Sequence, residues 1–218
     1  HEGGRCAGHD QRQRLSTLSL DWKNLPLIWF CRHGETAWNA EGRVQGQFDT
    51  DLNETGKRQA DANGLKLRKL IGNPETFDFI ASPLKRTRET MRRIRTGMGL
   101  PPEDYLLDDR LMEVHFGDWQ GFTLAEIGLV HPELLEARHR NKWNFIPPGP
   151  DAENYDMLAR RFAGWLETVQ VPTVCVTHGG VIRSLHHLVE GLDGETASRL
   201  PVPQDQVLRL ESGRLEWF

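Results

Sequence analysis

The sequence predicts an α/β fold, a three-layer αβα sandwich with a mainly parallel central sheet. Three observations support this prediction. Short apolar runs at 27–31, 77–81 and 173–177 have the length and composition of strands that are buried on both faces. Longer amphipathic patterns separate these runs. Alternation of strands with helices is typical of domains built on a parallel sheet.

The elements follow in order along the chain. Residues 1–24 are rich in Gly, Arg and Gln without a steady period, so we expect a loose N-terminal tail. Small residues recur every three or four positions over 53–71, which predicts a helix that packs closely on the sheet. Apolar residues on one face predict further helices over 151–169 and 181–190.

The last elements complete the sheet and its cover. Runs at 206–210 and 214–217 flank Ser212-Gly213, a signal for a β-hairpin. The segment at about 121–150 shows two short helical patterns followed by a Pro-rich stretch, which indicates an insertion over the sheet. We therefore expect residues 25–218 to form a single domain.

Composition narrows the function classes. The chain of 218 residues carries 27 Lys and Arg against 31 Asp and Glu, so it offers no basic surface for nucleic acid or anionic membranes. Its 3 cysteines do not form a disulfide framework, which favours a reducing compartment. No run approaches the roughly 18 apolar residues of a membrane span. We expect a soluble cytoplasmic protein without nucleic-acid or membrane partners.

Four polar clusters follow apolar strands or turns, and ligands of open α/β sheets bind beyond the carboxyl ends of strands. Together they supply two imidazoles, two guanidinium groups and a carboxyl. This set can provide a nucleophile, forks for phosphate oxygens and an acid for the leaving oxygen, which predicts phosphoryl transfer without a metal. The clusters are Arg32-His33-Gly34-Glu35-Thr36, Ser82-Pro83-Leu84-Lys85-Arg86, Glu113 within 111–119, and Thr177-His178-Gly179-Gly180.

No cofactor or metal site is predicted. The chain shows no set of carboxylates spaced like the ligands of Mg²⁺ or Mn²⁺. His186 and His187 are adjacent on a helix, so their side chains point about 100° apart and make a poor metal pair.

These motifs resemble the histidine phosphatase superfamily, the cofactor-dependent phosphoglycerate mutase-like proteins, in its phosphatase branch. The resemblance covers most of residues 26–190, and its motifs occur in order along the chain. Besides the first and last clusters quoted above, they are the stretch 46–56, Ser82 to Arg86, Glu113 with 116–121, and Pro147-Pro148-Gly149 with Glu153.

The resemblance implies that His33 is the nucleophile and becomes a phosphohistidine, and that Glu113 is the general acid and later the base. The phosphate-binding residues that it implies are Arg32, Asn39, Arg86 and His178. The residue chemistry agrees, because a nucleophilic imidazole must be neutral and neighbouring arginines disfavour its cationic form.

Some residues are open to two interpretations. Pro150 and the spacing to Glu153 depart from the family pattern, which leaves a ligand role for Glu153 open. His115 is either a hydrogen-bonded scaffold residue or a substrate contact. The basic run 138–142 is either a solvated helix end or a lid that attracts an anionic substrate. Arg92, Arg93 and Arg95 are expected on an exposed helix face.

The predicted activity is hydrolysis of a small phosphorylated metabolite. A cofactor-dependent phosphoglycerate mutase is one alternative, and a catalytically silent domain that binds a phosphate ligand is another. The segment between Glu113 and His178 is shorter than in the family's mutases, which favours access of water and hence hydrolysis. Residues 119–150, with Trp143 and Arg140, are expected to choose the substrate.

Overall fold

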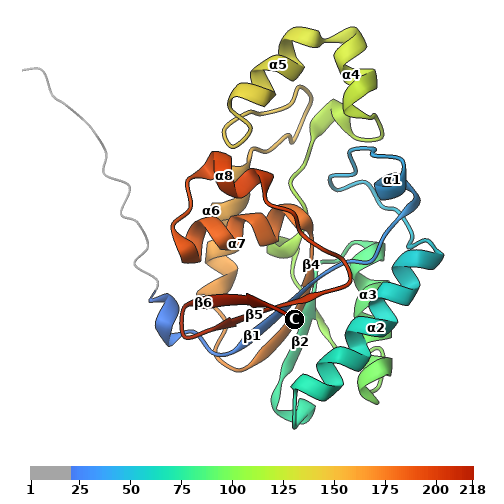
Figure 1. The fold of residues 1–218 in the computed structure, drawn as a ribbon, viewed down its shortest axis with the longest axis vertical. Coiled ribbons are helices and arrows are strands. Elements are labelled where there is room, and N and C mark those ends of the chain that lie inside the picture. Colours follow the sequence, from blue (N-terminus) through green and yellow to red (C-terminus); the bar gives the residue numbers. More distant parts are fainter. Residues whose placement is uncertain (1–20) are drawn as a thin grey trace, which may run out of the picture.

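The computed structural model describes residues 21–218. The predicted tail therefore lies almost wholly outside the described residues, and its last part forms the 3-10 helix η1 (Trp22–Asn24). From there the chain folds as three layers, with helices on both faces of a central sheet (Figure 1). The predicted α/β fold is confirmed.

The sheet has six strands in the order β3-β2-β4-β1-β5-β6. Its strands are β1 (Ile28–Arg32), β2 (Asp78–Ala81), β3 (Leu106–Leu107), β4 (Thr173–Thr177), β5 (Val207–Glu211) and β6 (Arg214–Trp217). Three neighbouring pairs are parallel, and β5 is antiparallel to both β1 and β6. All the predicted strands are present. The edge strand β3 was not predicted, because two exposed leucines carry no strand pattern of their own.

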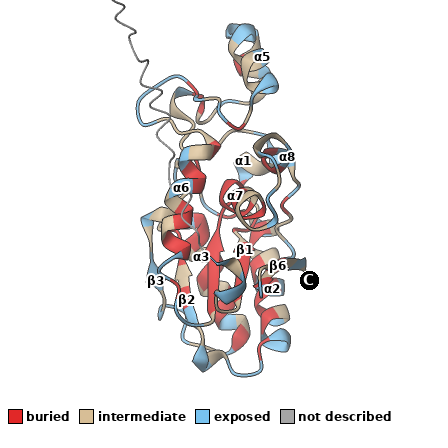
Figure 2. Cartoon of the chain, turned by 90° about the vertical axis from the view of Figure 1, so that its left-hand side faces the viewer, coloured by how far each residue is buried: buried red, intermediate tan, exposed pale blue. Residues whose placement is uncertain are grey.

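The central strand β1 shows why the apolar runs are continuous. Its residues alternate between two cores: Ile28 and Phe30 pack toward one layer of helices, and Trp29 and Cys31 toward the other. A strand covered on both faces has no polar side to display. The inner strands β1 and β4 are accordingly buried almost throughout, whereas the edge strands β3 and β6 are not (Figure 2).

Helices cover the two faces of the sheet. One face carries α2 (Glu54–Leu70) and α3 (Lys85–Met98), and the other carries α6 (Tyr155–Leu166) and α7 (Gly179–Glu190), with α8 (Gly194–Arg199) beside them (Figure 1). The predicted helices are confirmed in kind. Asn53 and Asn154 accept the amide hydrogens that begin α2 and α6, and Gly191 ends α7 in a left-handed conformation.

The small-residue stripe of α2 does not pack as predicted. A Cβ at Gly64 would lie 2.8 Å from the carbonyl oxygen of Ile94, and a Cβ at Gly97 would lie 3.1 Å from the Cα of Gly64. The absence of side chains thus lets α2 cross α3 closely. The prediction that the stripe faces the sheet was wrong at Gly64, because spacing alone does not say which neighbour a helix face meets.

Segments above the carboxyl ends of β1 and β4 cover that end of the sheet. They are α1 (Ala37–Ala40), α4 (Leu124–Val130) and α5 (Pro132–Arg140), with the 3-10 turns η3 (Asp109–Leu111) and η4 (Gly117–Trp119). A further 3-10 turn, η2 (Pro74–Thr76), precedes β2 at the opposite end of the sheet. The two short helices expected within 121–150 are α4 and α5. They stand beyond the sheet at one end of the molecule, and the outer one, α5, is mostly exposed (Figures 1 and 2).

Candidate active site

The sequence-predicted residues meet at the carboxyl ends of the parallel strands. The amide of His33 donates to the carbonyl of Thr177 at 2.9 Å, which continues the parallel pairing of β1 with β4 by one residue. The next residue after β4 is His178, and the ring centroids of His33 and His178 are 5.2 Å apart. His33 and His178 are far apart in the sequence, but they are neighbours in the structure because each follows one of two adjacent parallel strands.

The buried ring of His33 is held in one tautomer. Its Nδ1 lies 2.8 Å from the carbonyl oxygen of Gly34, and because a carbonyl only accepts, Nδ1 carries the hydrogen. Burial, followed by the charges of Arg86 and Arg32, holds the pKa of His33 well below 6.5. The ring is neutral at pH 7, and its Nε2 keeps an unprotonated lone pair.

Gly34 brings this loop against the start of α2. A Cβ at Gly34 would overlap the backbone of Gly56, so no other residue fits there without moving the loop. The amide of Gly34 donates to the hydroxyl of Thr90 on α3 at 3.1 Å. The motif glycine thus sets the turn that presents the His33 ring.

His178 is fully buried and its two ring nitrogens differ. Its Nε2 is 2.8 Å from the hydroxyl oxygen of Ser82, which follows β2, whereas its Nδ1 has no hydrogen-bond partner within residues 21–218. Burial, with the charges of Arg86 and other nearby basic groups, lowers the pKa of His178 well below 6.5. When Ser82 donates to Nε2, the hydrogen lies on Nδ1, where it can be given to a ligand oxygen.

Two arginines flank the histidines, the buried Arg86 and the half-buried Arg32. Arg86, in the first turn of α3, donates to the carbonyls of Phe48 at 2.8 Å and Gly46 at 2.7 Å. Arg32 donates to the carbonyl of Val202 at 2.8 Å. Burial lowers the pKa of each to about 10, so both remain charged at pH 7. Each Nε is buried without a partner in the described chain, which leaves donors for an anion.

The carboxylate of Glu113 is held by two backbone amides. Oε1 accepts from Val114 at 2.9 Å, and Oε2 accepts from Gly180, in the first turn of α7, at 3.1 Å. The charge of Glu113 also raises the pKa of Arg32 and Arg86, against the larger effect of burial. The carboxyl therefore lies close enough to both arginines to share their electrostatic field.

The loop that carries Glu113 is clamped by residues that the motifs did not single out as site residues. Arg161 on α6 donates to the carbonyls of Met112 at 2.8 Å and Glu113 at 3.1 Å, and it forms an ion pair with Glu153 at 2.8 Å. Gln47 donates to the same Glu113 carbonyl at 2.9 Å. Glu153, whose ligand role was open, holds Arg161 in place. The one sequence signal for Arg161 is its position eight residues after Glu153.

Asn39 lies beside the site, but its amide oxygen is occupied. It accepts from the backbone amide of Thr36 at 3.1 Å, in a reciprocal cap that begins α1. Gln204 donates to this oxygen at 3.3 Å and to the carbonyl of His33 at 3.0 Å. The structure thus places Asn39 near the His33 backbone, and its contact with phosphate stays a prediction.

Three further histidines, His115, His186 and His187, make hydrogen bonds within the scaffold. Nδ1 of His115 accepts from the amide of Gly117 at 3.0 Å. The amide of His115 donates to the Glu153 carboxylate at 3.1 Å, and its carbonyl accepts from the Glu153 amide at 2.9 Å, which favours the scaffold interpretation over substrate contact. His186 pairs with Glu190 at 2.7 Å, and His187 donates to the carbonyl of Leu192. Within residues 21–218 no three His, Cys, Asp or Glu side chains gather in a group that could hold a metal ion.

Two residues expected to choose the substrate differ from that expectation. Trp143 is only 6% exposed and stacks on Tyr155, with ring centroids 5.6 Å apart, so it is a core residue of the insertion. Arg140 is 70% exposed and pairs with Glu136 on its own helix. The basic residue of α5 that turns toward the domain is Arg138, which is half-buried.

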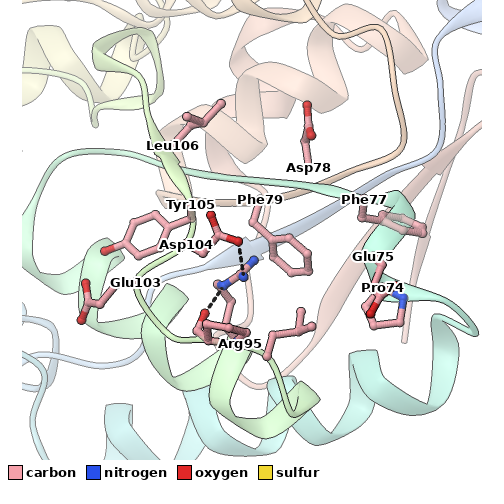
Figure 3. Close-up of a pocket in the computed structure, with 12 residues that line it drawn as sticks. Pro74, Glu75, Phe77, Asp78, Phe79, Arg95, Glu103, Asp104, Tyr105 and Leu106 are labelled. Atoms are coloured by element: carbon pink, nitrogen blue, oxygen red, sulfur yellow. Dashed lines mark hydrogen bonds and ion pairs between the residues drawn. The ribbon is translucent and has the colours of Figure 1, made fainter.

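A hollow of about 590 Å³ lies at the opposite, amino end of β2 and is lined by none of the predicted site residues (Figure 3). At its centre Arg95 stands 4.4 Å from the Phe79 ring centroid, donates to the carbonyl of Pro101 at 2.7 Å and pairs with Asp104 at 3.4 Å. Arg95 is thus buried and satisfied. The prediction of an exposed face was wrong for Arg95, whereas Arg92 and Arg93 form surface ion pairs.

Comparisons with known proteins identify the family of the chain. The family model described as histidine phosphatase superfamily (branch 1) matches residues 28–218. The chain is 34% identical to phosphoglycerate mutase-like protein 4 of Arabidopsis thaliana over 181 residues, which is 81% of this chain and 75% of the relative. It is 36% identical to the metal-independent phosphoserine phosphatase of the same plant over 164 residues, or 73% and 66% of the two chains.

A solved structure shows the same fold. Mycobacterial glucosyl-3-phosphoglycerate phosphatase, as a complex with VO3, superposes with a TM-score of 0.70 at 26% identity, over 88% of this chain and 96% of that one. The resemblance carried by the motifs is confirmed over nearly the whole described chain. The chain therefore belongs to the histidine phosphatase superfamily, branch 1, and is a phosphatase of that family.

Proposed function

We propose that this phosphatase hydrolyses small phosphomonoesters through a phosphohistidine at His33. The observation that carries the proposal is the tautomer of His33. Its Nδ1 hydrogen is committed to Gly34 and its low pKa keeps the ring neutral, so Nε2 is an unprotonated nucleophile at pH 7.

The first step transfers the phosphoryl group. The lone pair of His33 Nε2 attacks phosphorus, the bond from phosphorus to the ester oxygen breaks, and that oxygen takes a proton from the Glu113 carboxyl. Arg32, Arg86 and the Nδ1 hydrogen of His178 bind the phosphoryl oxygens, because their donors are not used up by the protein. The product is an alcohol, with the phosphoryl group on His33 and Glu113 ionised.

The second step regenerates the enzyme. Glu113, now a carboxylate, takes a proton from water as the water oxygen attacks phosphorus and the bond to Nε2 breaks. Inorganic phosphate leaves, and His33 is again neutral. The two guanidinium groups supply the electrostatic role that a metal ion plays in other phosphoryl-transfer sites, so no metal enters the steps.

The cell compartment and the extent of the domain are proposals as well. Cys31 and Cys175 lie on the neighbouring strands β1 and β4, buried and unpaired, which supports a reducing cytoplasm. Between residues 21 and 218, no helix is long and apolar enough to cross a membrane. We treat residues 25–218 as one histidine phosphatase-like domain with an insertion at about 121–150.

The decisive experiment traps the intermediate. The protein is mixed with a ³²P-labelled phosphomonoester, quenched in alkali, which preserves phosphohistidine, and digested. The label is expected on the peptide that contains His33, and His33→Ala should abolish both labelling and phosphate release while leaving the circular dichroism spectrum unchanged.

Label on a serine, a cysteine or His178 would overturn the assignment. In parallel, phosphate release is scored against isomerisation of 3-phosphoglycerate primed with a bisphosphate. Release without isomerisation supports the hydrolase. Isomerisation that outpaces release would make the protein a mutase, and binding without either reaction would make it a silent phosphate-binding domain.

A further inference from the structure

Beside the phosphoryl site lies a second group of basic side chains, Arg138, Lys142 and Arg183, which we call the second cationic cluster. Arg183 comes from α7, Arg138 from α5, and Lys142 from the loop after α5. A Cβ at Gly179 would lie 3.4 Å from Nη1 of Arg183 and 3.5 Å from Nε of Arg32. Both guanidinium groups therefore lie against the first turn of α7, so the cluster begins where the phosphoryl site ends.

The cluster is fixed by backbone carbonyls rather than by acids. Nε of Arg183 donates to the carbonyl of Leu200 at 2.8 Å. Lys142 donates to the carbonyl of Ser198 and stands 5.7 Å from the Tyr155 ring centroid. Arg138 is half-buried and makes no hydrogen bond or ion pair from its guanidinium within residues 21–218. Its donors are available to a ligand.

Tyr155 connects the cluster to the catalytic acid. Burial raises the pKa of its hydroxyl, the charges of Arg183 and Arg138 lower it, and the charge of Glu113 raises it. The hydroxyl thus lies within the fields of both Glu113 and the cluster. A substrate held at His33 with its leaving group toward Glu113 would extend toward these basic groups.

The positive charges are not neutralised locally. The acid that acts on Arg138 and Lys142 is Glu195, and its carboxylate is already engaged by Arg199 at 2.9 Å and by the amide of Trp143 at 2.8 Å. Burial, then the charges of Arg183, Arg138 and Arg199, lower the pKa of Lys142 to about 7. Gathering half-buried cations without a counter-ion is costly, and an anionic ligand removes that cost.

We propose that Arg138, Lys142 and Arg183 form a second anion subsite, which binds a carboxylate or a second phosphoryl group of the substrate while its phosphoester lies at His33. The preferred substrates are then small phosphomonoesters that carry a further negative charge. This inference rests on the proposed function, because it names the substrate class of the same site.

The test uses substrates that differ only in the second charge. 3-Phosphoglycerate and glycerol 1-phosphate share their phosphoester carbon and differ in a carboxylate against a hydroxymethyl group. Fructose 1,6-bisphosphate and fructose 1-phosphate form the corresponding pair for a second phosphoryl group. For the pair that fits, Arg138→Met should lower the ratio of kcat/KM values, charged over uncharged, by about ten- to a hundredfold, the range of one lost charge-assisted hydrogen bond.

The matched control is Arg140→Met, two residues further along the same chain segment. It removes the same charge from an exposed side chain that pairs with Glu136, so the ratio should stay at its wild-type value. A fall in either substrate pair that is confined to Arg138→Met supports the subsite and identifies its ligand. If Arg138→Met keeps the wild-type kcat/KM ratio for both substrate pairs, the subsite is overturned. If the ratio falls equally in Arg138→Met and Arg140→Met, the subsite is also overturned, because the effect is then one of total charge.

Lys142 provides a second readout. As pH rises through about 7 it loses its charge, so the kcat/KM ratio of the fitting pair should fall, and Lys142→Met should remove this pH dependence. The shared phosphate group cancels in the ratio. A ratio that does not change with pH in the wild type would contradict the involvement of Lys142.

The two proposals fail in different ways. If the wild type releases phosphate from none of these esters, the proposed function fails. Binding at the subsite is then measured by calorimetric titration of the same substrate pairs into His33→Ala protein. Tighter binding of the doubly charged member, lost in Arg138→Met, would still support the subsite, and equal binding of both members would overturn it.

Discussion

The amide of Gly180 donates to the carboxylate of Glu113 at 3.1 Å, and a Cβ on Gly180 would overlap Oε1 of the same carboxylate. The first turn of α7 therefore holds the proposed catalytic acid with a backbone donor and needs a residue without a side chain to do so. Gly180, the second glycine after His178, therefore has two roles. It lies in the first turn of α7, and it positions the carboxylate of Glu113.

Gly180→Ala should displace the carboxylate. We expect turnover of alkyl phosphates to fall about tenfold or more. A general acid accelerates such a reaction about 10²–10⁴-fold, and it does so only within hydrogen-bond distance of the leaving oxygen. Overpacking should cost about 1–3 kcal/mol of unfolding free energy. Steady-state kinetics and urea unfolding measure the two effects. Gly164→Ala on α6 is the matched control, because a Cβ there meets no heavy atom within 4 Å. Equal losses in both variants would refute the contact.

Glu113→Gln should distinguish leaving groups. An alkoxide needs a proton as it departs, whereas the p-nitrophenolate ion departs without one, so alkyl phosphates should slow about 10²–10⁴-fold and p-nitrophenyl phosphate far less. The measurement is kcat/KM for glycerol 1-phosphate and p-nitrophenyl phosphate with both proteins. Equal slowing of the two substrates would assign Glu113 a structural role.

Activity should survive removal of metals. The charges of Arg32 and Arg86 stabilise the transferring group, so exhaustive dialysis against EDTA should leave kcat unchanged, and added Mg²⁺ should not raise it. Vanadate, which takes up the five-coordinate geometry of the transferring phosphoryl group, should inhibit competitively. Loss of activity on chelation, with recovery on adding a divalent ion, would exclude the metal-free mechanism.

The buried histidines make stability depend on pH. Burial holds the pKa of His33 and His178 well below 6.5, so the unfolded chain binds protons that the folded chain does not. The contribution of these two histidines to the free energy of unfolding should be flat above about pH 7.5 and fall as pH drops below about 6.5, by up to about 1.4 kcal/mol per pH unit for each histidine.

Urea unfolding between pH 5 and pH 8 measures this slope. In His33→Gln the slope below about pH 6.5 should be smaller by one histidine's share, whereas His131→Gln, at an exposed histidine, should keep the wild-type slope. A His33→Gln slope equal to that of the wild type would show that His33 titrates normally in the folded protein.

The sequence by itself determined the fold class and indicated which groups meet at the candidate site. Continuous apolar runs predict strands buried on both faces, and Arg32, His33 and His178 each occur where such a run ends. Parallel strands end at the same edge of a sheet, so the proximity of these residues could be predicted without coordinates. The hydrogen bond from the amide of His33 to the carbonyl of Thr177 confirms that the two strand ends are adjacent.

The tertiary structure alone decided what surrounds these groups. The clamp of Arg161 on the Glu113 loop requires α6 to lie beside that loop, and Arg183 and Arg32 both lie against Gly179 only because α7 begins at the end of β4. Likewise the sequence pattern does not distinguish Arg138 from Arg140, which belong to the same basic run. In the structure Arg138 is half-buried and Arg140 is exposed. Strand ends are local and visible in a pattern, whereas the neighbour that a helix face meets depends on how the whole chain packs.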